Sequence, residues 1–256
     1  MRCSLGRRPS CAPPKVQLRG ALARRVRRAR LRGDAVECPC CGRTWSAFAP
    51  AWNRPNAICP GCGAHERHRG LWLYLRERLG LGSEPLRLLH FAPEYALRGP
   101  IDALDRIDYV TADLDPAGVD VQLDITDMPF DDGGFDAIVC SHVLEHVPDD
   151  RAAMSELARV LAPGGWLLVL VPLDPGRERT HEDPAVQAPE DREREFLQHD
   201  HVRLYAPDIA DRLQEAGLVV RAEHLANALP EGAVARHGLL GDETVFHCTR
   251  PASFVA

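Results

Sequence analysis

The stretch from Asp124 to Leu173 decides the fold, and it reads DITDMPFDDGGFDAIVCSHVLEHVPDDRAAMSELARVLAPGGWLLVLVPL. Phe135–Cys140 is a short apolar run and Trp166–Val171 is an unbroken one, which is the pattern of strands buried in a parallel sheet. Between them, apolar residues recur at helical spacing and predict one buried stripe: Met154, Leu157, Ala158 and Leu161. The order strand, helix, strand predicts a right-handed crossover between two parallel strands.

Capping residues mark both ends of the predicted helix. Asp149 or Asp150 precedes the apolar stripe, and either carboxylate is a suitable N-terminal cap. Pro163-Gly164-Gly165 follows the stripe and ends the helix, because glycine readily takes the left-handed conformation found after helix C-termini. The unit is therefore bounded on both sides and belongs to an α/β fold.

The order of these signals resembles the class I S-adenosylmethionine-dependent methyltransferases. In that family an acidic residue closes the third strand, and here it is Asp124. An L-P-F-x-D-x-x-F-D segment then leads into the fourth strand, which here is MPFDDGGFD at residues 128–136. R-V-L-x-P-G-G leads into the fifth strand, and here RVLAPGG stands at residues 159–165. Several pieces in the right order are more specific than any one alone; an ordinary crossover without a cofactor is the plain alternative.

The resemblance covers about residues 86–250 and implies both fold and activity. It implies a Rossmann-like seven-stranded sheet with helices on both faces and an antiparallel last strand. Leu86–Phe91 is expected to be the first strand, and residues 119–124 the third. The resemblance further implies S-adenosyl-L-methionine as the cofactor and methyl transfer as the reaction.

Charge is distributed unevenly along the 256 residues, whose net charge is −6. Residues 1–33 hold ten Arg, one Lys and no acid, and we expect a disordered or weakly helical tail that could touch RNA or anionic lipid. The remainder keeps 20 basic against 37 acidic residues, a net charge of −17. Such an acidic body is a poor surface for nucleic acid.

Composition also bears on the compartment and on the cysteines. The chain has no run of 18 or more apolar residues and no apolar signal-peptide core at its N-terminus, so we expect a cytoplasmic protein without a membrane span. In a reducing cytosol, the nine cysteines indicate metal binding rather than disulfides.

Two matched cysteine knuckles predict a zinc ribbon at residues 34–80, with a helix that links it to the main domain. CPCCG at residues 38–42 and CPGCG at residues 59–63 give the spacing C-x2-C-x17-C-x2-C. This spacing lies in the range of structural zinc sites, and four thiolates make a closed tetrahedral site. The predicted ligands are Cys38, Cys41, Cys59 and Cys62, with Cys40 pointing away.

The resemblance implies that S-adenosylmethionine binds where the first four strands end. Asp113 would bind the ribose hydroxyls, with Asp115 as the second candidate, because a carboxylate offers two strong acceptors. Asp124 would accept from the adenine amino group while Ile125 packs on the ring. The family's first loop is rich in glycine, but here it has none. The full predicted set is Phe91, Ala92, Glu94, Asp113, Leu114, Asp124, Ile125, Ser141 and His142.

Histidines are the candidate bases for taking a proton from the acceptor, since imidazole titrates near neutrality. His142, just after the fourth strand, is the first choice. His181, His199 and His201 follow from a long loop, and His146 and Glu145 are weaker candidates. A histidine that only packs in the cleft is the plain alternative for each one.

A substrate cleft is expected between the zinc module and the long loop, because both follow or precede strand ends at one edge of the sheet. The predicted contacts are Arg67, His68, Arg203 and Tyr205, beside Arg69. A network of interdomain ion pairs is the alternative.

Three functions remain open from the sequence. The acidic body favours a methyltransferase with a small-molecule acceptor, such as a sugar or a secondary metabolite, methylated at oxygen or nitrogen. A ribosomal RNA base methyltransferase would need a basic face. A cofactor-binding protein without transferase activity is allowed by the missing glycines. The sequence identifies neither the acceptor nor the oligomeric state.

Overall fold

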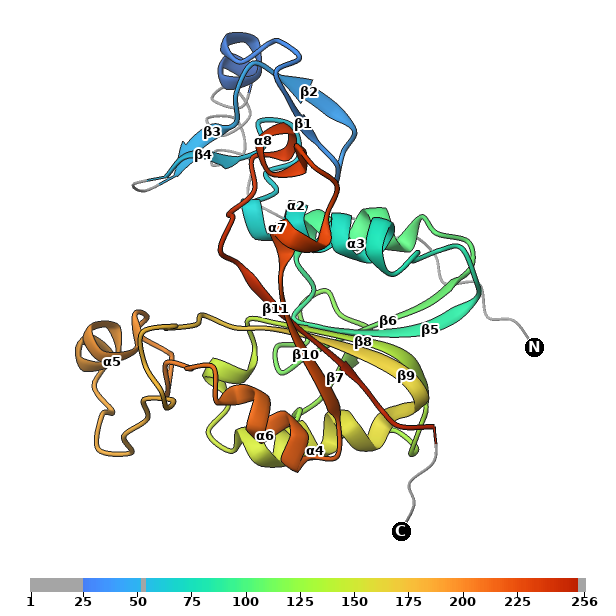
Figure 1. The fold of residues 1–256 in the computed structure, drawn as a ribbon, viewed down its shortest axis with the longest axis vertical. Coiled ribbons are helices and arrows are strands. Elements are labelled where there is room, and N and C mark those ends of the chain that lie inside the picture. The colour runs from blue at the N-terminus through green and yellow to red at the C-terminus, as the bar shows by residue number, and fades with distance from the viewer. Residues whose placement is uncertain (1–24, 52–53, 253–256) are drawn as a thin grey trace.

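A computed structural model describes residues 25–51 and 54–252, and it shows a small N-terminal module above an α/β domain (Figure 1). The tail up to residue 24 therefore lies outside the described residues. Residues 25–30 are helical, and Arg28 donates to the carbonyl oxygens of Pro60 and Gly61 at 3.0 and 2.6 Å. This end of the basic tail packs against the second cysteine knuckle.

The α/β domain contains one seven-stranded sheet in the order β10-β11-β9-β8-β5-β6-β7. β5 pairs in parallel with β6 and β8, whereas β11 runs antiparallel to both β9 and β10. The seven-stranded Rossmann-like sheet and its antiparallel last strand, both expected from the sequence, are confirmed. The strands are β5 (Leu86–Phe91), β6 (Ile107–Asp113), β7 (Val121–Gln122), β8 (Phe135–Ser141), β9 (Leu161–Leu170), β10 (Val219–His224) and β11 (Thr244–Thr249).

Helices cover both faces of this sheet (Figure 1). One face carries α4 (Asp150–Val160) and α6 (Ile209–Glu215). The other carries α2 (Glu66–Leu73) with its continuation η1 (Tyr74–Arg78), α3 (Tyr95–Asp102) and α7 (Leu225–Ala228). None of the helices in the described part of the chain is long and apolar enough to cross a bilayer.

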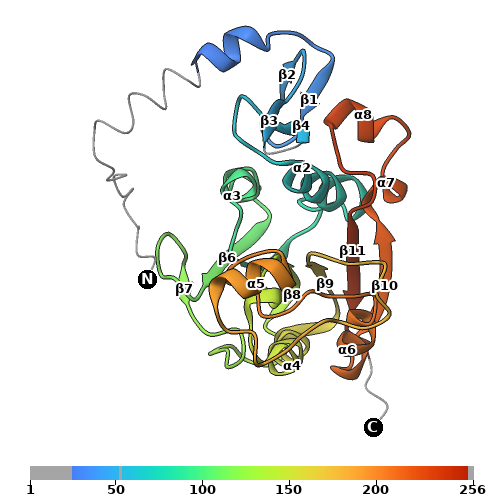
Figure 2. The same cartoon turned by 90° about the vertical axis from the view of Figure 1, so that its left-hand side faces the viewer.

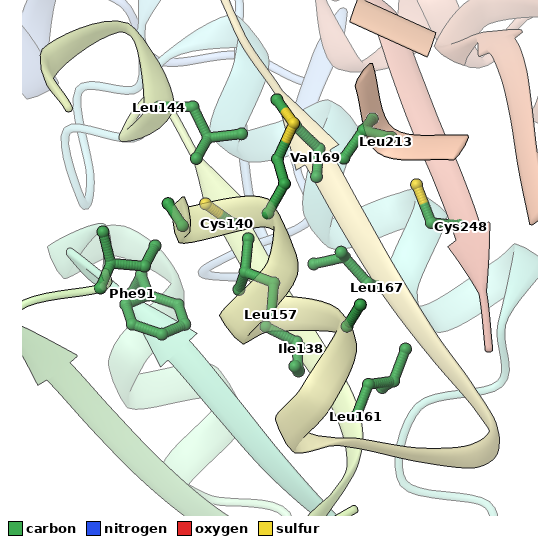
Figure 3. Close-up of a cluster of buried hydrophobic side chains, with 14 of the residues drawn as sticks. Phe91, Ile138, Cys140, Leu144, Leu157, Leu161, Leu167, Val169, Leu213 and Cys248 are labelled. Atoms are coloured by element: carbon green, nitrogen blue, oxygen red, sulfur yellow. The ribbon is translucent and has the colours of Figure 1, made fainter. Parts of the chain in front are cut away.

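The helix α4 forms because its sequence supplies both a cap and an apolar face. Asp149 accepts a hydrogen bond from the Ala152 amide at 3.0 Å and so satisfies one donor of the first turn. Leu157 lies against Ile138 and Leu167 of the sheet, and Leu213 of α6 completes this core (Figure 3). The helix ends one residue earlier than the apolar stripe suggests, because Leu161 already pairs with Phe135 as the first residue of β9.

The third strand is shorter than the residues 119–124 expected from the sequence. Two aspartates flank β7 and bond locally: the Asp120 carboxylate accepts from the amide and hydroxyl of Thr111, and Asp124 accepts from those of Thr126. Such side chains compete with the sheet for backbone donors. Only Val121 and Gln122 remain in the ladder.

The N-terminal module consists of two small antiparallel hairpins around the cysteine knuckles. β1 (Val36–Cys38) pairs with β2 (Arg43–Trp45), and β3 (Ala49–Ala51) pairs with β4 (Arg54–Ile58). The segment between β10 and β11 returns to this module, where α8 (Ala233–His237) packs beside β1 (Figure 2). The N-terminal module and this later segment therefore build the upper part of the molecule together.

Arg69 of α2 joins these two segments from a fully buried position. Its guanidinium donates to Asn56, Ala57 and Ala64 in the module at 3.2, 2.9 and 2.7 Å. It also donates to His237 and Gly238 after α8, both at 2.7 Å, and lies over the Phe48 ring. Arg69 was expected beside the substrate contacts, but it is not available to a substrate, because five carbonyl groups already use its donors.

Candidate functional site

A cavity of about 370 Å³ opens where the parallel strands β5, β6 and β8 end. Ligands in open α/β sheets bind at this carboxyl edge. Seven of the residues predicted to bind cofactor line the cavity: Phe91, Ala92, Asp113, Leu114, Asp124, Ile125 and His142. The remaining lining residues are not among those predicted to bind cofactor, and of them the sequence indicates only His146, as a weaker candidate base: Ala112, Leu123, Val143, His146, Val147 and Pro148.

Two carboxylates stand on one side of the cavity. Asp113 ends β6, and its Oδ1 accepts from the Asp115 amide at 3.1 Å. Asp124 follows β7, and its Oδ1 accepts from the Thr126 amide and hydroxyl at 2.9 and 2.7 Å, which lowers the pKa of its carboxyl group. Each carboxylate uses one oxygen to hold its own turn, so the other remains for a ligand. Two oriented acceptors fit a ligand rich in hydroxyl and amino donors, as an adenosine group is.

The backbone is strained at two residues that line the cavity. Ala92 after β5 has φ 43°, and His142 after β8 has φ 55°. Both values lie in the left-handed region, which side chains other than glycine rarely adopt. Ala92 thus adopts the left-handed turn after β5 that a glycine would ordinarily make in this loop. Strained residues of this kind gather at functional sites, where the surrounding structure holds them in place.

His142 and Glu145 form a pair at the mouth of the cavity. Nδ1 of His142 lies 3.2 Å from Oε1 of Glu145, which belongs to the short helix η2 (Leu144–His146) and is 1% exposed. Nε2 of His142 and Oε2 of Glu145 are buried and have no hydrogen-bond partner among the described residues. The carboxylate thus fixes the imidazole through Nδ1, and Nε2 remains available to a ligand.

Comparison with known proteins places this fold among the methyltransferases. Residues 99–169 match the family Methyltransf_11, described as a methyltransferase domain. A demethylmenaquinone methyltransferase of Thermus thermophilus is 34% identical over 138 residues, which cover 49% of this chain and 63% of the relative. A demethylmenaquinone methyltransferase of Mycolicibacterium gilvum is 52% identical over 46 residues, which cover 18% of this chain and 20% of that relative. This chain thus spans less than two thirds of the curated relatives it matches.

Solved structures show the same architecture. An S-adenosylmethionine-dependent methyltransferase from Mesorhizobium loti superposes with a TM-score of 0.51 at 14% identity, covering 71% of this chain and 98% of that one. The cyclase SpnF superposes with a TM-score of 0.50 at 17% identity, covering 73% and 83%. At such identities the likeness concerns the fold.

The main domain has the fold of a class I methyltransferase domain, and residues 99–169 carry the sequence match to such a domain. Its seven-stranded sheet, its antiparallel last strand and a cavity at the strand ends agree with what the sequence resemblance implied.

Two residues predicted to bind cofactor lie behind the cavity of the methyltransferase domain instead. Oε2 of Glu94 contacts Nε2 of His90 at 3.0 Å, and its Oε1 accepts from the Ser141 hydroxyl at 2.7 Å. Burial would raise the pKa of Glu94, but the bonds from His90 and Ser141 outweigh it and lower this pKa to about 2. Glu94 and Ser141 therefore brace β5 against β8 and do not line the cavity.

Arg203 and Tyr205 are likewise occupied by the protein itself. Arg203 donates to Glu182 at 2.8 Å, and to the carbonyl groups of Leu144, Val147 and Pro148. The fully buried Tyr205 donates its hydroxyl to Asp150 at 2.8 Å. Neither side chain is available to a substrate. Arg203 instead fixes the cavity wall at Val147 and Pro148 to the loop after β9.

Of the two loop histidines, His201 approaches the cavity and His181 does not. His181 contacts Glu195 of α5 (Pro189–Phe196) at 3.2 Å. His201 is 4% exposed, its Nδ1 lies 2.9 Å from the Phe196 carbonyl oxygen, and its ring packs edge-on against His146. Burial lowers the pKa of His201. The structure thus groups His201 with Glu145 and His146.

The start of α2 carries Arg67 and His68, two of the predicted substrate contacts. His68 is buried, which lowers its pKa to about 4, and its Nε2 has no hydrogen-bond partner among the described residues. Burial raises the pKa of Glu243, and the charges of His142 and Arg67 act on it in the opposite direction. Arg67 and His142 therefore lie within electrostatic reach of one carboxyl group.

The four cysteines of the two knuckles converge as the sequence predicted. Sγ of Cys38 lies 3.6 Å from Sγ of Cys62, and Sγ of Cys41 lies 3.8 Å from Sγ of Cys59. Tetrahedral zinc, bound at about 2.3 Å from each sulfur, sets neighbouring sulfurs about 3.8 Å apart. The donor set and its spacing therefore fit one structural zinc ion. Cys40 points instead to the His68 carbonyl oxygen.

Proposed function

We propose that this protein transfers a methyl group from S-adenosylmethionine to a small-molecule acceptor. The observation that carries the proposal is the cavity at the carboxyl edge of the sheet, with Asp113 and Asp124 on one side and His142 on another. When bound, S-adenosylmethionine supplies an electrophilic methyl group, whose bond to sulfur breaks as the acceptor's lone pair attacks. The protein must hold the two reactants in line and exclude water.

The roles of the residues follow from their positions. Asp113 and Asp124 bind the adenosine part through their free carboxylate oxygens, and Ile125 and Leu114 pack on it. His142 takes the acceptor's proton at Nε2, because Glu145 holds Nδ1. A base placed within hydrogen-bond reach of that proton contributes about 10²- to 10⁴-fold to the rate.

A small acceptor is favoured over RNA by two observations. Outside residues 1–33 the net charge is −17, which repels a polyanion. The two curated relatives described above are named for demethylmenaquinone, a small molecule. We therefore expect an acceptor with an ionisable hydroxyl or amine, bound between the start of α2 and the loop after β9.

Titration calorimetry tests cofactor binding. The wild-type chain should bind S-adenosylmethionine, and Asp113→Ala should bind it about tenfold to a hundredfold more weakly, because a charged hydrogen bond is worth about 1.5–3 kcal/mol. Asp115→Ala is the matched control, since Asp115 is exposed two residues away and does not line the cavity. Its affinity should equal that of the wild type.

Transfer is tested with tritium-labelled cofactor and a cell extract separated into small molecules and RNA. Label should enter the small-molecule fraction. Label in RNA would overturn the choice of acceptor, and binding without any transfer would favour a cofactor-binding protein that is not a transferase. A wild-type chain that binds no S-adenosylmethionine would contradict the whole proposal.

A further inference from the structure

Three metal-ligand side chains meet beside the cavity, separate from the cysteine cluster. Glu145 and His146 come from η2, and His201 comes from the loop that follows α5. One ligand atom from each lies within 4.8 Å of those of the other two. Glu145 is 1% and His201 4% exposed, so two of the three ligands are buried, and the site is partly open at His146, whose side chain is 33% exposed.

The buried carboxylate of Glu145 lacks a partner for one of its oxygens. Oε1 contacts Nδ1 of His142, but Oε2 has no hydrogen-bond partner among the described residues. Leaving a charged, buried acceptor unsatisfied is strongly unfavourable. A cation bound at Oε2 would satisfy it and would leave the bond to His142 in place.

Both histidines are oriented as metal ligands usually are. Nδ1 of His201 lies 2.9 Å from the Phe196 carbonyl oxygen, and Nδ1 of His146 lies 3.4 Å from Oδ2 of Asp200. The Phe196 carbonyl oxygen accepts a proton from Nδ1 of His201, and the Asp200 carboxylate favours a proton on Nδ1 of His146, which leaves the lone pair on Nε2 of each ring. Metal-bound imidazoles carry just such a carbonyl or carboxylate on the other ring nitrogen.

We propose that Glu145, His146 and His201 bind one divalent transition-metal cation of the Zn²⁺ or Fe²⁺ type. Two imidazoles and one carboxylate suit these ions, whereas Mg²⁺ and Ca²⁺ prefer oxygen ligands alone. Ligand atoms bound about 2.0–2.2 Å from such an ion stand roughly 3–3.5 Å from one another. The three ligand atoms, now within 4.8 Å of one another, would therefore need to approach by about an ångström to bind the ion.

Three protein ligands leave a coordination position for a further molecule. His146 also lines the cavity, so the acceptor class that fits is one with an ionisable hydroxyl. Binding its oxygen to the cation lowers the hydroxyl's pKa and eases proton transfer to His142. This consequence rests on the proposed function, whereas the metal site does not.

Cobalt titration of the full chain, with zinc already on its cysteines, tests the site. The wild type should take up a second metal ion, and its visible spectrum should lack the intense sulfur-to-cobalt bands of a cysteine site. Glu145→Gln should bind this Co²⁺ at least tenfold more weakly, and Asp200→Asn about tenfold to a hundredfold more weakly. His199→Gln is the matched control, because His199 is an exposed histidine of the same loop and should leave the affinity unchanged.

Three results would overturn the proposal: no saturable Co²⁺ uptake by the wild type, unchanged uptake by Glu145→Gln, or displacement of Co²⁺ by equimolar Mg²⁺. If circular dichroism shows that Glu145→Gln does not fold, His146→Gln decides in its place, because His146 is only partly buried. Calorimetry with S-adenosylmethionine on the same samples separates the two proposals. A wild-type chain that binds S-adenosylmethionine but takes up no second Co²⁺ ion would contradict the metal site and leave the proposed function intact.

Discussion

At the scale of single residues, His142 combines the properties that the proposed reaction needs. Its left-handed backbone turns the residue out of β8 at the carboxyl edge, where it lines the cavity. Glu145 holds Nδ1, and the buried Nε2 has no other partner among the described residues. Replacing the imidazole should therefore affect proton removal more than cofactor binding.

We predict that His142→Gln lowers the rate of methyl transfer by about 10²- to 10⁴-fold, because glutamine cannot accept the acceptor's proton. The affinity for S-adenosylmethionine should change by less than about threefold. For comparison, loss of an interaction worth about 1.4 kcal/mol would weaken binding about tenfold. Single-turnover kinetics and calorimetry measure the two quantities. His224→Gln, at the end of β10, serves as the control. Equal losses of rate and affinity would make His142 a binding residue rather than a base.

The sequence predicts which residues lie at the strand ends better than it predicts which side chains those residues contact. Asp113, Asp124 and His142 could be placed at one edge because each follows an apolar run that reads as a parallel strand. Glu94 and Ser141 follow the same rule in the sequence, yet they pair with each other behind the cavity. His146 and His201 meet across a separation of 55 residues, and no local pattern signals such a contact.

At the scale of elements, α2 holds the N-terminal module, the α/β domain and the α8 segment together. The buried guanidinium of Arg69 supplies the link, with five carbonyl groups as its acceptors. The sequence predicts this helix from its apolar spacing. It could not predict the role of Arg69, since three of the acceptors lie in the module and two lie about 170 residues later.

We predict that Arg69→Met lowers the free energy of unfolding by about 3–5 kcal/mol, because it leaves buried carbonyl groups without donors. Arg69→Lys should recover only part of this loss, since an ammonium group has three donors and no planar fork. Arg67→Met, two residues earlier and exposed, should change the same free energy by less than about 0.5 kcal/mol. Urea denaturation followed by circular dichroism compares the three. Equal stability of the Arg69→Met and Arg67→Met chains would contradict the linking role.

At the scale of the whole molecule, the zinc module is built into the fold rather than attached by a linker. Arg236 of α8 pairs with Glu37 at 3.1 Å, and Nδ1 of His237 lies 2.9 Å from the Glu37 carbonyl oxygen. Module and domain also share one apolar core, to which Cys59, Leu71 and Leu168 belong. Unfolding of the module should therefore destabilise the α8 segment and α2 as well.

We predict that the purified chain holds one zinc ion on its cysteines, and that Cys59→Ser loses it. Because the binding free energy of such an ion is also folding free energy, the melting temperature of Cys59→Ser should fall. Cys40→Ala is the matched control: Cys40 is buried in the same module but lies outside the four-sulfur cluster, so this variant should keep its zinc.

Metal analysis after dialysis measures the zinc content, and calorimetric melting measures the melting temperature. A Cys59→Ser chain with the zinc content and melting temperature of the wild type would rule out the site. If only a separate, low-temperature melting transition shifts in Cys59→Ser, the module instead unfolds independently of the rest of the molecule.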